Sequence, residues 1–332
     1  MTGRPGAAEA GFGKVLEAGG PRLAELLERT EARLAEVARS HGDTLGRHAG
    51  ATLAAGGKRL RPILLFLCAG EATSDALVDA AAAVELLHMA TLVHDDVLDR
   101  APLRRGRPTV FATDGPAAAT ATGDLLFSRS FAELLRSRDP EAVRDLSRAS
   151  SALARGELMQ RADAWSADVP EERYLERCVL KTGRLFEAAC RLGARLGDPG
   201  PAAADALGTF GAAVGLAFQI FDDVLDVSGP VERTGKHRGT DLLDGTVTLP
   251  LILARRADSG LRSLDLRAEV RTPEAAEAVC DRIAATGALT AARERALEHV
   301  AAAKAALDEA SLPDRTRRAL ELVADGVVAR YA

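Results

Sequence analysis

The chain has 332 residues, of which 47% are hydrophobic but only 4% aromatic, and its formal net charge is −5. Nucleic-acid-binding domains are usually clearly basic, so this charge argues against a nucleic-acid partner. Ala, Leu, Arg and Glu dominate the sequence and are strong helix formers, so we expect an almost all-helical protein.

Cysteine usage and the N-terminal residues bear on the compartment. The four cysteines show no CxxC spacing and lie in apolar or helical surroundings, which favours reduced, buried thiols and a cytoplasmic protein. Residues 1–19 are rich in Gly and Ala without a continuous apolar stretch, so we expect a flexible lead-in and no signal peptide. No run of about 18 apolar residues occurs, so we expect no transmembrane segment.

Apolar residues recur at helical spacing along the rest of the chain. The breaks between these stretches are too short to be interdomain linkers. We therefore expect one all-α domain over 20–332, a bundle of long helices around a central cavity. The expected helices cover residues 21–39, a segment ending near 53, 62–69, 75–100, 116–136, 141–165, 171–196, 202–228, 246–257, 274–285, 289–307 and 314–330.

An acidic motif lies near the C-terminal end of the helix predicted over 75–100. In Leu92-Val-His-Asp95-Asp96-Val-Leu-Asp99, the first and last aspartates are four apart and project from one helix face, with Asp96 at its edge. A single string of this kind is more often a solvated helix face or a cap. Crowded carboxylates beside apolar neighbours repel one another unless a cation is present.

The same five residues return as Asp222-Asp223-Val-Leu-Asp226, directly after Phe218-Gln-Ile-Phe. Apolar flanks tether both copies to helices that are largely buried, and buried carboxylates need cations or Arg partners. Two copies therefore favour a metal cage, and oxygen-only ligands point to Mg²⁺. The predicted metal ligands are Asp95, Asp96, Asp99, Asp222, Asp223 and Asp226.

Basic residues cluster at three places, each of which alone would be an ordinary solvated charge run. Together with the acidic motifs they suit a polyanionic substrate such as diphosphate, which Arg grips with two hydrogen bonds and Lys meets as a point charge. They imply two diphosphates, one held through metals and one directly. The clusters are Lys58, Arg59 and Arg61; Arg104, Arg105 and Arg107; and Lys236, His237 and Arg238.

With these motifs in this order, the chain resembles a trans-type isoprenyl diphosphate synthase of the polyprenyl synthetase family, which implies the isoprenoid synthase type of helical bundle. The resemblance covers most of the chain. Besides the two aspartate motifs, it is carried by Gly56-Gly57-Lys58-Arg59-Leu60-Arg61-Pro62, Arg104-Arg105-Gly106, Gly123-Asp124, Gly156-Glu157, Lys181-Thr182-Gly183, Phe218-Gln219 and the stretch from Gly235-Lys236 to Leu249-Pro250.

The resemblance implies a prenyltransferase that joins isopentenyl diphosphate head-to-tail to an allylic diphosphate such as farnesyl diphosphate. It implies three Mg²⁺ ions held by the six aspartates, a homodimer, and transient membrane contact for product release. Carried over residue by residue, Arg104, Lys181 and Lys236 contact the allylic diphosphate, Lys58, Arg61, His88 and Arg105 hold isopentenyl diphosphate, and Thr182 and Gln219 lie near the reacting carbon. One departure is Thr246, where much of the family has a lysine.

Product length depends on what blocks the growing tail below the acidic motif. Ala90 and Thr91 stand where short-chain members of the family often carry a bulky aromatic. Leu87 comes next on that face, and Phe127 and Phe131, four apart on another helix, are candidates for the floor. We expect a long-chain product of about six to ten isoprene units, with a geranylgeranyl or farnesyl diphosphate synthase as the alternative.

Two further alternatives stay open. A class I terpene cyclase shares the helical fold, but its second metal motif is of the Asn/Ser/Glu type rather than a repeated DDVLD. A non-catalytic subunit of a heteromeric synthase usually loses aspartates, and none is lost here.

Overall fold

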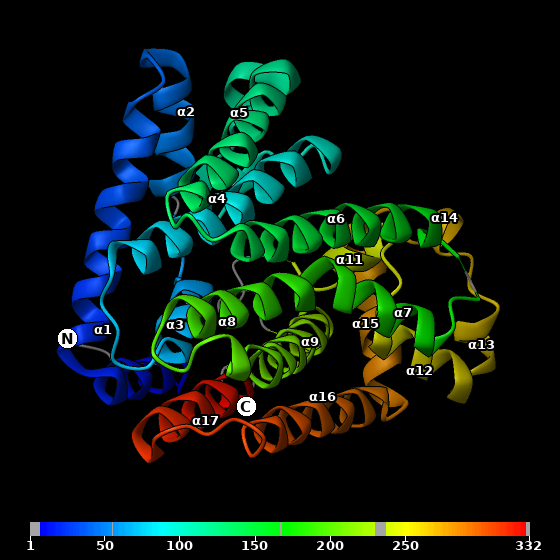
Figure 1. Cartoon of the computed structure of the whole chain (residues 1–332). Coiled ribbons are helices and arrows are strands. Elements are labelled where there is room, and N and C mark those ends of the chain that lie inside the picture. The colour runs from blue at the N-terminus through cyan, green and yellow to red at the C-terminus, as the bar shows by residue number, and fades with distance from the viewer. Residues whose placement is uncertain (1–6, 55, 167, 230–236, 330–332) are drawn as a thin grey trace, which may run out of the picture.

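The computed structural model describes residues 7–54, 56–166, 168–229 and 237–329, and within them helices prevail, as the composition predicted (Figure 1). The strands β1 (Leu103–Arg104) and β2 (Arg107–Pro108) form one small antiparallel hairpin in the basic loop. The helices of the first half are α1 (Ala7–Arg39), α2 (Asp43–Ala54), α3 (Leu60–Cys68), α4 (Asp75–Leu98), α5 (Val110–Leu135), α6 (Pro140–Asp163), α7 (Glu171–Cys178) and α8 (Arg184–Leu196).

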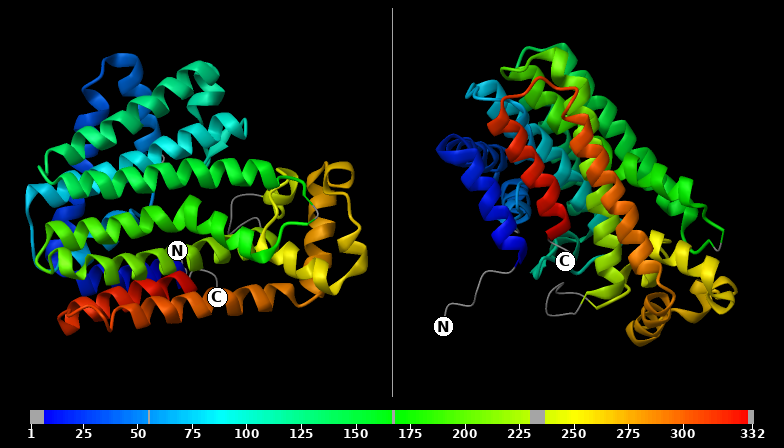
Figure 2. Two further views of the ribbon diagram at one scale, coloured as in Figure 1. Left: turned by 45° about the vertical axis from the view of Figure 1, so that its right-hand side comes forward. Right: turned by 90° about the horizontal axis from the view of Figure 1, so that it is seen from below.

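The second half begins with α9 (Ala204–Ser228), which packs against α8 and α16. Four short helices then follow and gather, with α15, at one end of the bundle (Figure 2). The remaining helices are α11 (Thr240–Leu243), α12 (Leu249–Ala257), α13 (Ser259–Arg262), α14 (Leu266–Glu269), α15 (Pro273–Ala285), α16 (Ala288–Ala306) and α17 (Asp314–Ala329).

The helices α4 and α9, which carry the two aspartate motifs, form much of the core. Both are long and apolar enough to cross a membrane by length and composition, but 78% and 61% of their most apolar windows are buried inside the protein. A search for uninterrupted apolar runs does not single out these two helices, because a few polar residues interrupt the runs while the mean hydropathy stays high. Their burial against other helices is what a core helix requires.

The N-terminal segment differs from the expected loose lead-in, since α1 already begins at Ala7. The break falls at Gly20, whose φ of 68° lies in the left-handed region, and Pro21 follows it. Val15, within the first part of α1, is only 4% exposed. This part of the chain therefore packs onto the bundle.

The helix predicted over 171–196 is interrupted by a π-helical turn, η1 (Val179–Gly183). Such turns are rare and often lie at functional sites. The turn lies close to α6 at Gly156, where a Cβ would come within 2.6 Å of the backbone nitrogen of Lys181. The close approach of the two backbones places Lys181 and Thr182 at the wall of a cavity.

Candidate active site

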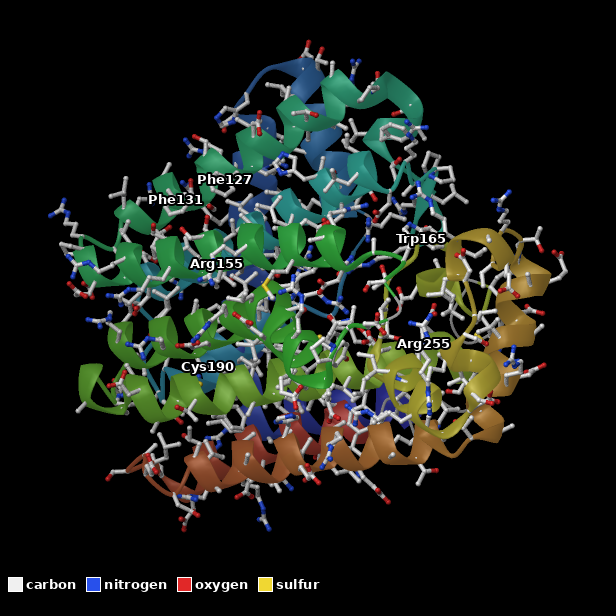
Figure 3. The ribbon with its side chains drawn as sticks, turned by 90° about the vertical axis from the view of Figure 1, so that its right-hand side faces the viewer. Phe127, Phe131, Arg155, Trp165, Cys190 and Arg255 are labelled. Atoms are coloured by element: carbon white, nitrogen blue, oxygen red, sulfur yellow. The ribbon has the colours of Figure 1, made fainter. Side chains whose placement is uncertain are left out.

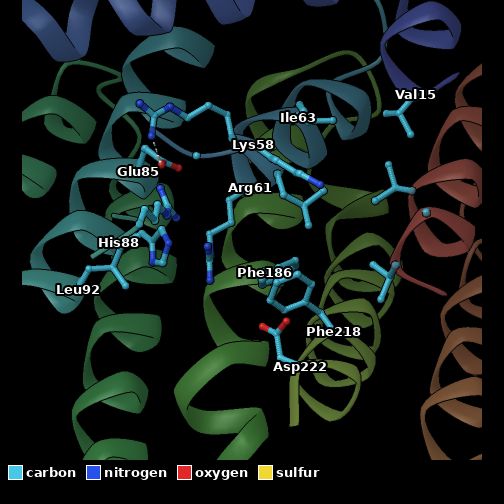
Figure 4. Close-up of a pocket in the computed structure, with 17 residues that line it drawn as sticks. Val15, Lys58, Arg61, Ile63, Glu85, His88, Leu92, Phe186, Phe218 and Asp222 are labelled. Carbon is cyan, nitrogen blue, oxygen red and sulfur yellow. Dashed lines mark hydrogen bonds and ion pairs between the residues drawn. The ribbon is translucent and has the colours of Figure 1, made fainter. Parts of the chain in front are cut away.

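Two adjoining cavities lie between α4, α8 and α9. The larger has a volume of about 560 Å³ and the smaller about 360 Å³. Their walls share Arg61, His88, Leu92, Phe218 and Asp222, so the two spaces meet at these residues (Figure 4). The charged side chains of the larger cavity are mainly basic, whereas those of the smaller one are the carboxylates of Asp95, Glu157 and Asp222 together with Arg61 and Lys181.

The four residues predicted to hold isopentenyl diphosphate all line the larger cavity: Lys58, Arg61, His88 and Arg105. Figure 4 shows the Arg61 side chain between His88 and Phe186. Its guanidinium carbon lies 4.6 Å from the Phe186 ring centroid, and burial lowers the pKa of Arg61 to about 10. The Arg61 Nε atom has no hydrogen-bond partner among the described residues. An anion in the cavity would satisfy it.

His88 faces this cluster of positive charge. Burial and the neighbouring guanidinium groups, with Arg61 first among them, hold the pKa of His88 well below its ordinary value. The imidazole is therefore neutral at neutral pH. A neutral ring can donate one hydrogen bond to a diphosphate without adding charge.

Arg59, a member of the same basic cluster, turns away from the others. It has a left-handed φ of 49° and binds Glu85 at 2.7 Å and Glu31. Glu85 is only 4% exposed, so the pair compensates its charge. Arg59 thus fixes the loop before α3 rather than extending the phosphate-ready surface.

The first aspartate motif contributes Asp95 to the smaller cavity, which Lys181 also lines. Burial raises the pKa of Asp95 to about 6, and the Lys181 charge acts against this rise. Lys181 is held by Glu157 at 2.5 Å and by Gln160 at 3.3 Å. Glu157 belongs to the Gly156-Glu157 motif, but its role as the partner of Lys181 was missed in the sequence.

The other two aspartates of this motif have arginine partners. Arg104 Nε donates to Asp96 Oδ1 at 2.7 Å, and Arg161 Nη2 donates to Asp99 Oδ1 at the same distance. Arg161 also binds Glu157 at 2.8 Å. Like Glu157, Arg161 was missed in the sequence, because its place in this network depends on how α6 crosses α4.

The second aspartate motif is tied into a hydrogen-bonded chain. Thr182 Oγ1 donates to Gln219 Oε1 at 2.8 Å, and Gln219 Nε2 donates to Asp223 Oδ1 at 2.9 Å. The hydroxyl of Tyr174, a further residue missed in the sequence, donates to Asp223 Oδ2 at 2.6 Å. Burial, together with the Asp241 charge, raises the pKa of Asp223 to about 7.

Asp226 accepts from backbone N–H groups at the start of α11. The nitrogens of Thr240 and Asp241 lie 3.1 and 3.2 Å from its two carboxylate oxygens. Burial and the Asp241 charge raise the pKa of Asp226 to about 8. Asp222, in contrast, lines both cavities.

The acidic residues fit a divalent cation, although the protein alone does not preform a closed cage. Among the described residues, no group of three or more His, Cys, Asp or Glu side chains converges to hold an ion. Mg²⁺ is usually bound by one or two carboxylates together with substrate phosphates and water. Asp95 and Asp222, which line the same cavity, offer such a partial set of ligands.

Three of the predicted chain-length residues line the smaller cavity: Leu87, Thr91 and Phe127. The Phe131 ring lies 5.4 Å from that of Phe127, on the same face of α5 (Figure 3). Ala90 lies elsewhere, in a second apolar cluster that includes Leu86 and Leu126. One residue step turns a helix by about 100°, so Ala90 and its neighbour Thr91 face different surroundings.

Lys236 lies outside the described residues. Thr246 lies just after Gly245, at the return from the second motif to α12. Its backbone N–H donates to the Asp241 carbonyl at 2.8 Å.

An all-helical bundle with two aspartate motifs opening on one cavity, beside a basic cavity, defines a class of enzymes that handle diphosphates. Residues 43–285 match the family model for polyprenyl synthetase. The chain belongs to this family and is a trans-prenyltransferase, a trans-prenyl diphosphate synthase.

The relatives include both long-chain and short-chain enzymes. The chain is 43% identical to heptaprenyl diphosphate synthase component 2 of Geobacillus stearothermophilus over 70% of this chain and 73% of that protein. It is 37% identical to geranylgeranyl diphosphate synthase of Methanosarcina mazei over 83% of this chain and 86% of that protein.

Among solved structures, it is similar to a polyprenyl synthase from Caulobacter crescentus complexed with calcium and isoprenyl diphosphate. The TM-score is 0.87 and the identity 34%, covering 97% of this chain and 98% of that one. The predicted family and fold are thereby confirmed.

Proposed function

We propose that this enzyme condenses isopentenyl diphosphate with an allylic diphosphate in a Mg²⁺-dependent reaction and extends the product to a long-chain all-trans polyprenyl diphosphate. The single observation that carries the proposal is that Asp95 and Asp222, from the two aspartate motifs, line one cavity that adjoins a basic one. This arrangement suits two diphosphates of which one is bound through cations and the other by side chains.

In this proposal, the allylic diphosphate lies at the smaller cavity and its tail extends past Thr91 and Leu87. The six aspartates hold Mg²⁺, which when bound neutralises and polarises the departing diphosphate. The calcium and isoprenyl diphosphate named for the Caulobacter crescentus structure support a divalent cation and a diphosphate for this family member. Lys181, placed by Glu157, adds a positive charge to the same anion.

Ionisation of the allylic C–O bond leaves a delocalised carbocation. The Thr182 and Gln219 oxygens, which are joined by a hydrogen bond, present negative dipole ends beside this carbon, and the apolar walls exclude water. The double bond of isopentenyl diphosphate, held by Arg61, Lys58, His88 and Arg105, attacks the cation. The proton released then passes to the departing diphosphate, because in this proposal Asp95 and Asp222 hold the cation and Glu157 binds Lys181.

A long product is supported by the small side chain of Thr91, four residues before Asp95 on the cavity wall. Leu87 lies one turn further along the same face. A geranylgeranyl diphosphate synthase is the second candidate, and the Methanosarcina mazei relative favours it.

The assembly is proposed to be a homodimer in the cytoplasm. All four cysteines are buried and free, which suits a reducing compartment. The name of the Geobacillus stearothermophilus relative, a component 2, supports a second possibility in which the chain works with a different subunit. Gel filtration with activity measured across the peak separates the two, because a heteromeric component would be inactive alone.

The test of the reaction is incubation of the purified chain with isopentenyl and farnesyl diphosphate, with and without Mg²⁺. We expect diphosphate release only with the metal, and none from the Asp95→Ala variant. Release of diphosphate from farnesyl diphosphate alone would instead indicate a cyclase.

A further inference from the structure

Arg177 is a buried arginine that belongs to none of the motifs described above. It lies in the last turn of α7, directly before the π-helical turn, and its side chain is only 3% exposed. A buried guanidinium is costly unless its charge and its donors are compensated. Its contacts therefore indicate what it is for.

The Arg177 guanidinium joins three parts of the protein. Its Nη2 donates to the Val247 carbonyl at 2.5 Å. Its Nη1 lies 3.6 Å from Asp163 Oδ2 but makes no hydrogen bond among the described residues. Its carbon lies 5.4 Å from the centroid of the Tyr174 ring, whose hydroxyl binds Asp223. Arg177 thus connects the segment around Val247 to the residue that holds Asp223.

The segment from Gly239 to Thr248, which we call the return segment, is fastened at both ends. At its start, backbone N–H groups bind the Asp226 carboxylate. Towards its end, the Gly245 carbonyl accepts from the backbone N–H of Trp165 at 2.8 Å. A Cβ on Gly245 would lie 2.2 Å from the Trp165 ring, so the two residues pack closely. Figure 3 shows Trp165 at the edge of the yellow region of the chain, to which the return segment belongs.

The return segment itself carries no positive side chain. It contains Asp241 and Asp244, and Thr246 is uncharged where the resemblance leads one to expect lysine. Arg238, just before it, is engaged by the Val227 carbonyl and Asp281. Arg177 is therefore a guanidinium that binds directly to this segment, one residue beyond Thr246.

We infer that Arg177 is a positioning residue for the second aspartate motif: it fixes the return segment against Tyr174, and so holds Asp223 and Asp226 in place for the allylic diphosphate. Its burial keeps it from touching substrate. The inference rests on the proposed function for its effect on the allylic substrate, but not for its effect on the return segment.

A purely structural ion pair with Asp163 is the alternative, and the chain offers a matched control for it. Arg173 is one turn earlier on α7 and binds the same Asp163 at 2.6 Å, but it is 43% exposed and makes no contact with Val247. Arg173→Gln removes an Asp163 partner only. Arg177→Gln removes an Asp163 partner and the bond to the return segment.

The experiment compares the Arg177→Gln, Arg177→Lys and Arg173→Gln enzymes with the wild type. The KM values for farnesyl and isopentenyl diphosphate are measured separately. Trp165, the one tryptophan of the chain, reports on the return segment by its emission, with and without Mg²⁺ and inorganic pyrophosphate. Emission needs no turnover, so it tests the inference even if the wild type proves inactive, which would overturn the proposed function alone.

For Arg177→Gln we expect about a tenfold rise in the KM for farnesyl diphosphate, because a buried hydrogen bond to a charged group is lost. The KM for isopentenyl diphosphate stays within about twofold, and the Trp165 emission moves to longer wavelength. Arg177→Lys keeps the charge on a single donor nitrogen, so its KM for farnesyl diphosphate should lie between those of the wild type and Arg177→Gln. If Arg177→Gln does not fold, the comparison of Arg177→Lys with the wild type tests the inference. Arg173→Gln behaves as wild type.

Three results would overturn the inference. The first is equal effects of Arg173→Gln and Arg177→Gln. The second is an equal rise of both KM values, and the third is an unchanged Trp165 emission in both Arg177 variants.

Discussion

The Thr182 hydroxyl donates to Gln219 Oε1 at 2.8 Å and so joins the π-helical turn η1 to α9. Gln219 in turn donates to Asp223 at 2.9 Å, which extends the connection to the second aspartate motif. Thr182 and Gln219 both line the smaller cavity. The π-helical turn thus sets the position of a hydroxyl that an ordinary helix would place elsewhere.

Loss of either side chain should lower kcat, and the two losses should not multiply in the double variant. We expect Thr182→Val and Gln219→Leu each to reduce kcat by about 10²-fold, the scale for removing one group that stabilises developing charge. Because the two side chains act together, the double variant should cost little more than the worse single variant. Steady-state kinetics on the four enzymes measures the coupling, and fully multiplied losses would show that they act independently.

The basic cavity predicts a substrate-specific effect of Arg61. Arg61→Ala should raise the KM for isopentenyl diphosphate about 10- to 100-fold, since a charge-assisted hydrogen bond is lost, and should leave that for the allylic substrate nearly unchanged. Arg59→Gln is the control, because Arg59 binds Glu31 and Glu85 instead. It should lower the melting temperature while retaining the wild-type KM for isopentenyl diphosphate. The reverse pattern would exchange the roles of the two arginines.

Substitution by Phe should have different effects at Thr91 and at Ala90, on product length at the first and on stability at the second. Thr91→Phe should shorten the product, because Thr91 lines the smaller cavity. Ala90→Phe should instead overpack the cluster with Leu86 and Leu126 and lower the free energy of unfolding by roughly 1–3 kcal/mol. Thin-layer separation of labelled products and urea unfolding measure the two effects. Shortened products from a fully stable Ala90→Phe enzyme would place the tail on the other side of α4.

The raised pKa of Asp226, about 8, predicts how the metal-free protein responds to pH. An aspartate whose pKa is raised by folding binds its proton more tightly in the folded state, so its contribution is present in acid and is lost as pH rises towards 8. Relative to Asp226→Asn, the metal-free wild type should therefore lose melting temperature between about pH 4, the pKa of an unfolded aspartate, and pH 8. Mg²⁺ with pyrophosphate should release protons over this range. A wild type that gains stability relative to the variant would contradict the assignment.

Much of this site follows from periodicity and repetition in the sequence. The apolar flanks of the aspartate motifs predicted that both motifs lie on buried helices, which are α4 and α9. The basic clusters predicted a site for a polyanion, and Lys58, Arg61 and Arg105 line one cavity. The features that could not be predicted depend on how each helix is rotated about its own axis and how closely neighbouring helices cross. Ala90 faces away from Thr91 by one step of the helix, and the partners of Lys181 depend on how closely α6 approaches at Gly156.

The buried polar contacts of Tyr174 and Arg177 could not be predicted from the sequence either. Tyr174 belongs to none of the sequence motifs, yet its hydroxyl binds Asp223, because α7 lies against α9. Arg177 likewise belongs to no sequence motif, yet it is buried and binds the return segment. Both depend on pairing between residues about 50 to 70 positions apart, which no local pattern encodes.

The measurement that tests the central claim most directly is the chain length of the product made from radiolabelled isopentenyl diphosphate and farnesyl diphosphate with Mg²⁺. The proposed function predicts labelled all-trans polyprenyl diphosphates of about six to ten isoprene units, and none from the Asp95→Ala enzyme. Geranylgeranyl diphosphate as the sole product would contradict the long-chain assignment, and no elongation at all by the chain alone would contradict a self-sufficient synthase.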